Sequence, residues 1–193
     1  MPKIERDSLL TLEAYARQRG EIRARVIDHK KRRTVHLGES VTLTFEDELT
    51  VRYQIQEMLR VERIFEDRGV EDELAAYNPL VPDGRNFKAT MMLEYPDSDE
   101  RRVRLAELIG IAEGTWVEVH GCERVRAIAD EDLERENSEK TSAVHFLRFE
   151  LTEPMAQKLK AGAGLAVGVD HPNYWVSVET LPAVREALVG DLA

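Results

Sequence analysis

The sequence contains a single cysteine, Cys122, so no disulfide can form within the chain and no cysteine-rich metal site can exist. It also lacks any apolar run approaching the roughly 18 residues that a membrane-spanning helix needs. Residues 1–7 have neither an apolar centre nor a small-residue cleavage site, so they do not resemble a secretory signal. These absences predict a cytoplasmic protein that does not associate with membranes.

The common catalytic motifs are absent as well. There is no glycine-rich phosphate loop, no Gly-x-Gly-x-x-Gly, no His-Glu-x-x-His and no Gly-x-Ser-x-Gly. The Glu-x-x-His ligand pair of di-iron bundles is missing too, so the chain does not look like a rubrerythrin. The sequence therefore identifies no catalytic residue and no cofactor, and it leaves open whether the protein is an enzyme.

The amino-acid composition is that of a folded protein. Of 193 residues, 42% are hydrophobic and 33% are charged, which is the composition of a well-solvated globular protein. A chain of this length buries roughly 70% of the surface that it exposes when unfolded. We therefore expect one domain over residues 1–193.

Charge is unevenly distributed along the chain. The net charge is −10, yet residues 1–36 carry ten Lys/Arg against five Asp/Glu, and the remainder is strongly acidic. An acidic body argues against nucleic-acid binding, because affinity for phosphates needs clustered cations. The one basic run is a candidate contact for a partner or an anion, or else the solvated last turn of a helix. It consists of His29, Lys30, Lys31, Arg32 and Arg33.

The N-terminal part, residues 1–80, is predicted to be mostly helical. Apolar residues at three- and four-residue steps indicate a first helix that Asp7 or Ser8 caps and that ends in the basic run. A hairpin of residues 33–37 and 41–45 follows. Asp47 can cap a second long helix, which we expect to end at Gly69.

The part from residue 86 to residue 181 repeats one order of elements. A strand at 87–95 leads through a helix to a strand at 115–120, and a strand at 144–151 leads through a helix to a strand at 165–169. Residues 125–129 and 174–179 are further strands, and a short helix occupies the C-terminal part, residues 182–193. Two strand–helix–strand units predict an α+β fold with one ferredoxin-like antiparallel sheet.

Several strings of the sequence resemble an uncharacterised bacterial family, number 3501 in the domain-of-unknown-function series. They are residues 50–60, 76–80, 136–142, 144–151 and 169–174. Genes of this family often neighbour those of rubrerythrin-like proteins and iron–sulfur oxidoreductases. The resemblance implies a role near peroxide defence or redox metabolism, with such proteins as partners.

Alternation along the predicted strands separates an apolar face from a charged one, because successive side chains point to opposite faces. The charged face is either a solvated surface with cross-strand ion pairs or a ligand-binding floor beneath the N-terminal helices. Its members are Lys88, Glu94, Glu118, His120, Arg148 and Glu150.

Four side chains of metal-binding type lie near predicted strand ends: His120, Cys122, His145 and His171. They could meet at one edge of the sheet and hold zinc or iron, although His171-Pro172-Asn173 also fits a plain turn.

Two functions follow from the sequence. The first is an accessory or binding protein that works with redox proteins through a surface, as a monomer or a homodimer. The second is an enzyme or sensor that binds a metal or a small anion on the charged face of the sheet.

Overall fold

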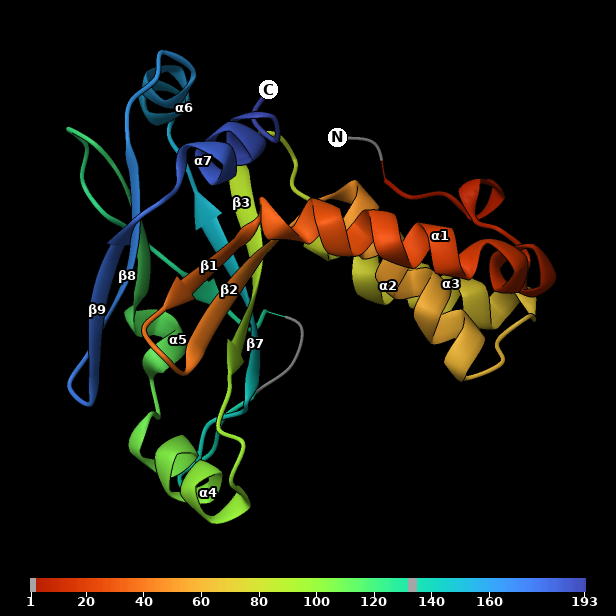
Figure 1. Ribbon diagram of the computed structural model, residues 1–193, viewed down its shortest axis with the longest axis horizontal. Coiled ribbons are helices and arrows are strands. Elements are labelled where there is room, and N and C mark those ends of the chain that lie inside the picture. Colours follow the sequence, from red (N-terminus) through yellow and green to blue (C-terminus); the bar gives the residue numbers. More distant parts are fainter. Residues whose placement is uncertain (1–2, 132–134) are drawn as a thin grey trace.

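The computed structural model describes residues 3–131 and 135–193. Three helices form the N-terminal part, on the right of Figure 1. They are α1 (Leu12–Lys31), α2 (Glu48–Val61) and α3 (Asp67–Tyr77), accompanied by the short 3₁₀ turns η1 (Arg6–Ser8) and η2 (Asn78–Leu80). Within the described residues, no helix has the length and apolar character to cross a membrane.

Local sequence explains where α1 and α2 begin. Thr11 caps α1 by accepting from the backbone N–H of Ala14, because the expected caps, Asp7 and Ser8, lie in η1. Asp47 caps α2 as predicted and forms a reciprocal capping box with Thr50. The predicted end of α2 at Gly69 is wrong.

The chain leaves α2 at Val61 and turns at Arg63, which has a positive φ of 55°. Gly69 lies inside α3 instead, so the glycine does not mark a helix end.

Two sheets make up the rest of the fold, and every strand pairing in them is antiparallel. Sheet A has the order β1 (Thr34–Leu37), β2 (Val41–Glu46), β3 (Asn86–Leu93), β7 (Val144–Glu150) and β6 (Ile128–Ala129). Sheet B has the order β5 (Val125–Arg126), β4 (Thr115–Val119), β8 (Leu165–His171) and β9 (Tyr174–Glu179).

The sheets face each other across one apolar core (Figure 1). Phe45 and Phe87 of sheet A meet edge to face, with ring centroids 5.9 Å apart. Opposite them, sheet B contributes buried valines from β4 and β8, among them Val117 and Val167. The predicted C-terminal helix forms α7 (Pro182–Val189), which buries Leu188 in the same core.

The single ferredoxin-like sheet is wrong, although both repeated units exist. In the first unit, β3 leads through α4 (Ser98–Glu107) and α5 (Ile111–Gly114) to β4; in the second, β7 leads through α6 (Glu153–Lys160) to β8. Each unit thus begins in sheet A and ends in sheet B. The second strand of each unit buries its apolar face against the opposite sheet instead of extending the first sheet.

The predicted strand at residues 125–129 is also divided between the sheets. β5 pairs with β4 in sheet B, whereas β6 pairs with β7 in sheet A. Ala127 between them is buried in the core and donates its backbone N–H to Thr115. This segment therefore joins the two sheets along one edge.

The packing of the outer face of sheet B yields a stability prediction. A Cβ at Gly168 would lie 2.3 Å from the buried ring of Trp116 and 2.6 Å from the carbonyl oxygen of Val176. We expect Gly168→Ala to lower the free energy of unfolding by about 1–3 kcal/mol. The added methyl group would overpack the site, and the backbone carbonyl beside it cannot move away.

Gly20→Ala in α1 is the matched control, since a Cβ there meets nothing within 4 Å. It should raise stability by about 0.5–1 kcal/mol through helix propensity. Urea unfolding of both variants measures the difference, and equal stabilities would contradict the packing argument.

A candidate ligand cleft between the helices and sheet A

The outer face of sheet A carries an ordered row of charges. Glu46, Lys88 and Arg148 lie opposite one another on β2, β3 and β7. The next row toward the middle of the strands consists of Thr44, Thr90 and Phe146. Because directly opposed side chains in a sheet have Cβ atoms about 5 Å apart, these groups form one continuous floor.

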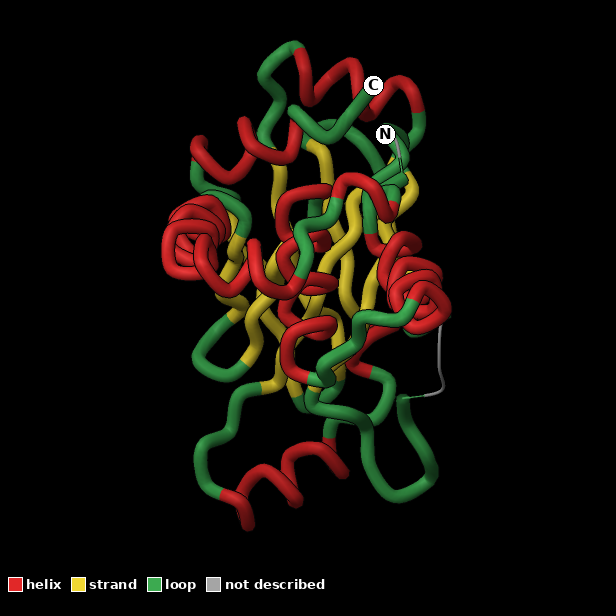
Figure 2. Tube along the Cα trace, turned by 90° about the vertical axis from the view of Figure 1, so that its right-hand side faces the viewer, coloured by secondary structure: helices red, strands yellow, loops and turns green. Residues whose placement is uncertain are grey.

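Helices α2 and α3 stand over this floor without filling the space above it. Two adjoining cavities remain, of about 380 Å³ and 250 Å³, and Tyr77, Leu80 and Phe146 line both. We call them together the helix–sheet cleft. Figure 2 views the molecule from the helical side, with the strands behind the helices. The apolar part of the larger cavity comes mainly from Met58, Ala76, Tyr77, Pro79, Leu80 and Phe146.

Paired interactions anchor the helices that cover the cleft. Gln56 of α2 bonds the backbone of Leu10 through both its amide oxygen and its amide nitrogen, at 2.8 and 3.2 Å. Glu57 receives two bonds of 2.8 Å from Arg19 of α1 and one of 2.6 Å from Tyr15. Arg19 and Tyr15 together hold the pKa of Glu57 at about 2, although burial opposes them.

Arg148 is the best-anchored charge in the cleft. Its Nε and Nη2 each donate to Glu131 at 2.7 Å, and its Nη1 donates to Glu150. These carboxylates raise the pKa of Arg148 further above its already high value, while Arg148 lowers the pKa of Glu131. The guanidinium is therefore a permanent cation on the cleft floor.

Lys88 is half-buried beside Arg148, and its amine has no hydrogen bond or ion pair with any residue in the described ranges. Burial lowers the pKa of Lys88, and the positive charge of Arg148 lowers it further; Glu131, Glu150 and Asp83 act in the opposite direction without cancelling the effect. The opposed Glu46 instead accepts a 2.6 Å hydrogen bond from Thr90.

Glu73 of α3 is an acidic group lining the same cavity. Its Oε2 is buried and, within residues 3–131 and 135–193, has no hydrogen-bond partner. Burial raises the pKa of Glu73, and the nearby Glu62 and Asp72 add to that rise. The larger cavity thus combines a lysine shifted toward its neutral form with a carboxyl group shifted toward its protonated form.

Comparison with known proteins identifies a family for the chain. Residues 3–192 match the family described as "Protein of unknown function (DUF3501)". The chain belongs to the DUF3501 family. A crystal structure of a novel protein of unknown function from Burkholderia pseudomallei K96243 is 55% identical to it, covers 100% of both chains and superposes with a TM-score of 0.96. None of the curated proteins is significantly similar to the chain.

In this DUF3501 protein the predicted charged face is divided between the two sheets. Lys88, Arg148 and Glu150 lie on sheet A, and Glu94 follows β3, where it accepts from Thr42. Glu118 and His120 instead belong to the outer side of sheet B and pair with Arg124 and Glu179. Strand alternation correctly separated charged from apolar positions. The prediction that all the charged positions share one face is wrong, because the strands belong to different sheets.

The four metal-ligand candidates have separate partners. His120 bonds Glu179, His171 bonds the carbonyl oxygen of Ile109, and the buried His145 bonds Asp130 and Thr141. Cys122 is a partly buried free thiol that packs against the core. Across the described ranges, no three His, Cys, Asp or Glu side chains are grouped so that they could hold a metal ion.

Sequence patterns predicted two of the residues that line the larger cavity, Lys88 and Arg148, and missed the others. Glu73 comes from α3, Glu131 and Arg135 come from the connection before β7, and Phe146 belongs to β7. Arg135 stacks over Phe146 at 4.5 Å from the ring centroid and pairs with Asp130 at 3.2 Å. A run of acidic and basic residues in a connection is usually solvated, so nothing in the sequence distinguished these positions.

The residues of the basic run lie in different environments. Lys30 lines the smaller cavity of the cleft, whereas Lys31 pairs with Asp28 at 3.2 Å on the surface and Arg32 is exposed. Arg33 is only 2% exposed, so the prediction of a solvated helix end is wrong for this residue.

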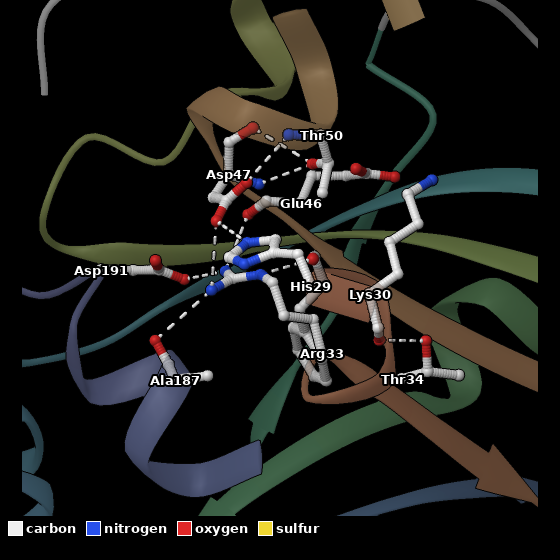
Figure 3. Close-up of polar contacts among 10 residues, drawn as sticks. His29, Lys30, Arg33, Thr34, Glu46, Asp47, Thr50, Ala187 and Asp191 are labelled. Carbon is white, nitrogen blue, oxygen red and sulfur yellow. Dashed lines mark hydrogen bonds and ion pairs between the residues drawn. The ribbon is translucent and has the colours of Figure 1, made fainter. Parts of the chain in front are cut away.

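Arg33 lies among acceptors from three segments of the chain, as Figure 3 shows. Its Nε donates to the carbonyl oxygen of Phe45 at 2.9 Å, Nη1 to that of Ala187 at 3.4 Å, and Nη2 to Asp191. Asp47 lies 3.4 Å from Nη1 and also bonds His29 at 2.6 Å. We call Arg33, Asp47, His29 and Asp191 the Arg33 cluster.

The two acids of the Arg33 cluster are shifted in opposite directions. Burial raises the pKa of Asp191 to about 6, although Arg33 favours its ionised form. Burial also tends to raise the pKa of Asp47. Arg33, the backbone N–H of Thr50 and His29 outweigh this effect, so the pKa of Asp47 is lowered.

Replacing Arg33 tests the structural role of the cluster. We expect Arg33→Met to lower the free energy of unfolding by about 3–5 kcal/mol, because removing one partner leaves Asp191 and Asp47 buried without their cation. Arg32→Met is the control and should change stability by less than about 0.5 kcal/mol. Chemical denaturation monitored by circular dichroism compares them; equal effects would show that Arg33 is as solvated as Arg32.

The raised pKa of Asp191 predicts a pH dependence. An acid whose pKa is 3.8 when unfolded and about 6 when folded stabilises the fold fully below pH 3.8 and loses that contribution as the pH rises through 6. Relative to Asp191→Asn, which cannot ionise, the natural protein should lose about 1–3 kcal/mol of stability between pH 4 and pH 7.

Urea titrations of both proteins at several pH values measure this difference. The opposite shift of Asp47 lies at lower pH and occurs in both proteins, so it largely cancels. A difference that stays constant from pH 4 to pH 7 would contradict the assignment.

Proposed function

We propose that this protein is a binding protein or enzyme that takes a small organic anion in the helix–sheet cleft. The observation that carries the proposal is the position of Lys88, an amine without an ion-pair partner among the described residues, beside the permanently charged Arg148 in a cavity with apolar walls. A cavity of about 380 Å³ with a few polar groups has the size and character of small-molecule sites.

The charge balance of the larger cavity favours an anion. The residues that line this cavity include three cations, Lys88, Arg135 and Arg148, and two acids, Glu131 and Glu73, and burial raises the pKa of Glu73. Lys88 makes no ion pair in the described residues, although Glu46 lies opposite it on β2. Partly desolvated charges are stabilised by pairing, so a ligand carboxylate would stabilise the charged form of Lys88.

Arg148 has the capacity to take part in that binding. A guanidinium has five N–H donors, and Glu131 and Glu150 occupy three of those of Arg148. The remaining two suit a carboxylate, which accepts from arginine in a planar, bidentate manner. The apolar walls formed by Tyr77, Leu80 and Phe146 would then cover the organic part of the ligand.

Binding of 4-methylpentanoate, an apolar carboxylate of suitable size, tests the proposal. We expect chemical-shift changes at Phe146 and Tyr77 in NMR titrations of the natural protein. Lys88→Met should weaken binding roughly 10- to 100-fold, because a hydrogen bond to a charged group contributes about 1.5–3 kcal/mol.

Lys31→Met is the matched control, since Lys31 belongs to the exposed Asp28 pair. It should leave the affinity unchanged. Shifts confined to residues outside the cleft, or equal loss in both variants, would contradict this site.

The accessory role beside rubrerythrin-like or iron–sulfur proteins rests on the family resemblance and remains a prediction, as does a homodimer. Co-purification with such proteins at micromolar concentration tests the first, and light scattering of the purified chain tests the second.

A further inference from the structure

We propose that Lys88 is a carbonyl-capturing nucleophile, whose Nζ condenses with the carbonyl carbon of a small 2-oxo acid held in the helix–sheet cleft. The inference rests on the proposed function, because it adds a covalent step to the anion site described above. Three features of the larger cavity support it: the placement of the amine, the surroundings that lower its pKa, and a carboxyl group that lines the same cavity.

The backbone holds the amine in a defined place. Lys88 lies on β3, which hydrogen-bonds to β2 on one side and β7 on the other, so its main chain is fixed within the centre of sheet A. Its neighbours on the strand, Phe87 and Ala89, are buried in the core on the inner face. The side chain therefore has to project toward the cleft, where it is half-buried among the cavity-lining groups.

The surroundings favour the neutral amine that a nucleophile requires. A lysine becomes nucleophilic when it is desolvated or lies next to another cation, because both conditions disfavour the ammonium form. Lys88 meets both conditions through its burial and through Arg148. Glu131 and Glu150 raise the pKa of Lys88 without cancelling the downward shift, and both carboxylates bond Arg148, while Glu46 bonds Thr90.

Glu73 supplies the second chemical group. Its buried, unpartnered Oε2 lines the same cavity within the described part of the chain, and its surroundings favour the protonated carboxyl. A neutral carboxylic acid can donate a proton to an oxygen that develops negative charge and can recover it afterwards. Glu73 is thus placed to assist departure of the carbonyl oxygen as water.

The covalent step needs no further reagent. The lone pair of Nζ forms a C–N bond with the carbonyl carbon, while the carbonyl oxygen takes a proton from Glu73 and becomes a hydroxyl group. Nζ returns one proton to the Glu73 carboxylate, which gives the neutral carbinolamine. Glu73 donates this proton to the hydroxyl group, which leaves as water. The protonated imine then gives its last N–H proton to Glu73, so that an imine joins Lys88 to the organic acid and the carboxyl group is restored. The carboxylate of the 2-oxo acid would accept from the two remaining donors of Arg148.

Reductive trapping tests this chemistry on the whole protein. The chain is incubated with 4-methyl-2-oxopentanoate and sodium cyanoborohydride, which reduces an imine but not the free ketone, and is then analysed by intact mass and peptide mapping. We expect one reduced adduct per chain, located at Lys88 among the seven lysines of the sequence. Adducts spread over exposed lysines at the rate of Lys31, or no adduct, would overturn the inference.

Variants separate the nucleophile from its proton donor. Lys88→Arg keeps the positive charge but removes the nucleophilic amine, so trapping at this position should disappear, whereas Lys31→Arg should trap like the natural protein. Glu73→Gln should slow trapping at Lys88 roughly 100-fold, as expected for loss of a general acid. An unchanged rate in Glu73→Gln would remove Glu73 from the mechanism. Because the mapped adduct on the natural chain needs no variant, the test holds even if a variant fails to fold.

The outcome also distinguishes this inference from the proposed function. Binding of 4-methylpentanoate without trapping of its 2-oxo analogue would overturn the role of Lys88 as a nucleophile and leave the anion site standing. Failure of both experiments would overturn both proposals.

Discussion

Arg33 connects segments that are distant in the sequence. Its guanidinium is buried where the end of β2, the cap of α2 and the turn after α7 meet, and it bonds groups from all three. A buried cation is tolerated only when its donors are satisfied, so these segments have to converge on it. This convergence sets the start of α2 against the edge of sheet A. The geometry of the helix–sheet cleft depends on that arrangement.

Sheet A serves two purposes because its faces differ. The inner face is apolar and packs against sheet B, whereas the outer face carries Glu46, Lys88 and Arg148 in one cross-strand row. Helices α2 and α3 bury their apolar residues mainly against each other and the N-terminal segment, in a cluster separate from the inter-sheet core. They therefore cover the charged face without collapsing onto it, and the space between is lined by both kinds of side chain.

The charged side chains of the cleft affect one another's pairing and pKa values because they are neighbours on adjacent strands. Arg148 binds the two nearby carboxylates, and Lys88 has this cation as a neighbour and makes no ion pair in the described chain. A single charged pair on a sheet surface would be a minor stabilising contact. Here burial and the charge of Arg148 together lower the pKa of Lys88, which is the direction that the proposed chemistry requires.

The sequence alone determined the Asp47 cap of α2, the β1–β2 hairpin, the repeated order of elements and the separation of charged from apolar strand positions. These are local properties, set by capping, turn chemistry and the two-residue period of a strand. Only the tertiary structure decided which strands share a sheet, and hence that Lys88 and Arg148 lie apart from Glu118 and His120. It also decided that Arg33 is buried and that Glu73 and Lys88 line one cavity, because such positions depend on long-range packing that residue spacing does not encode.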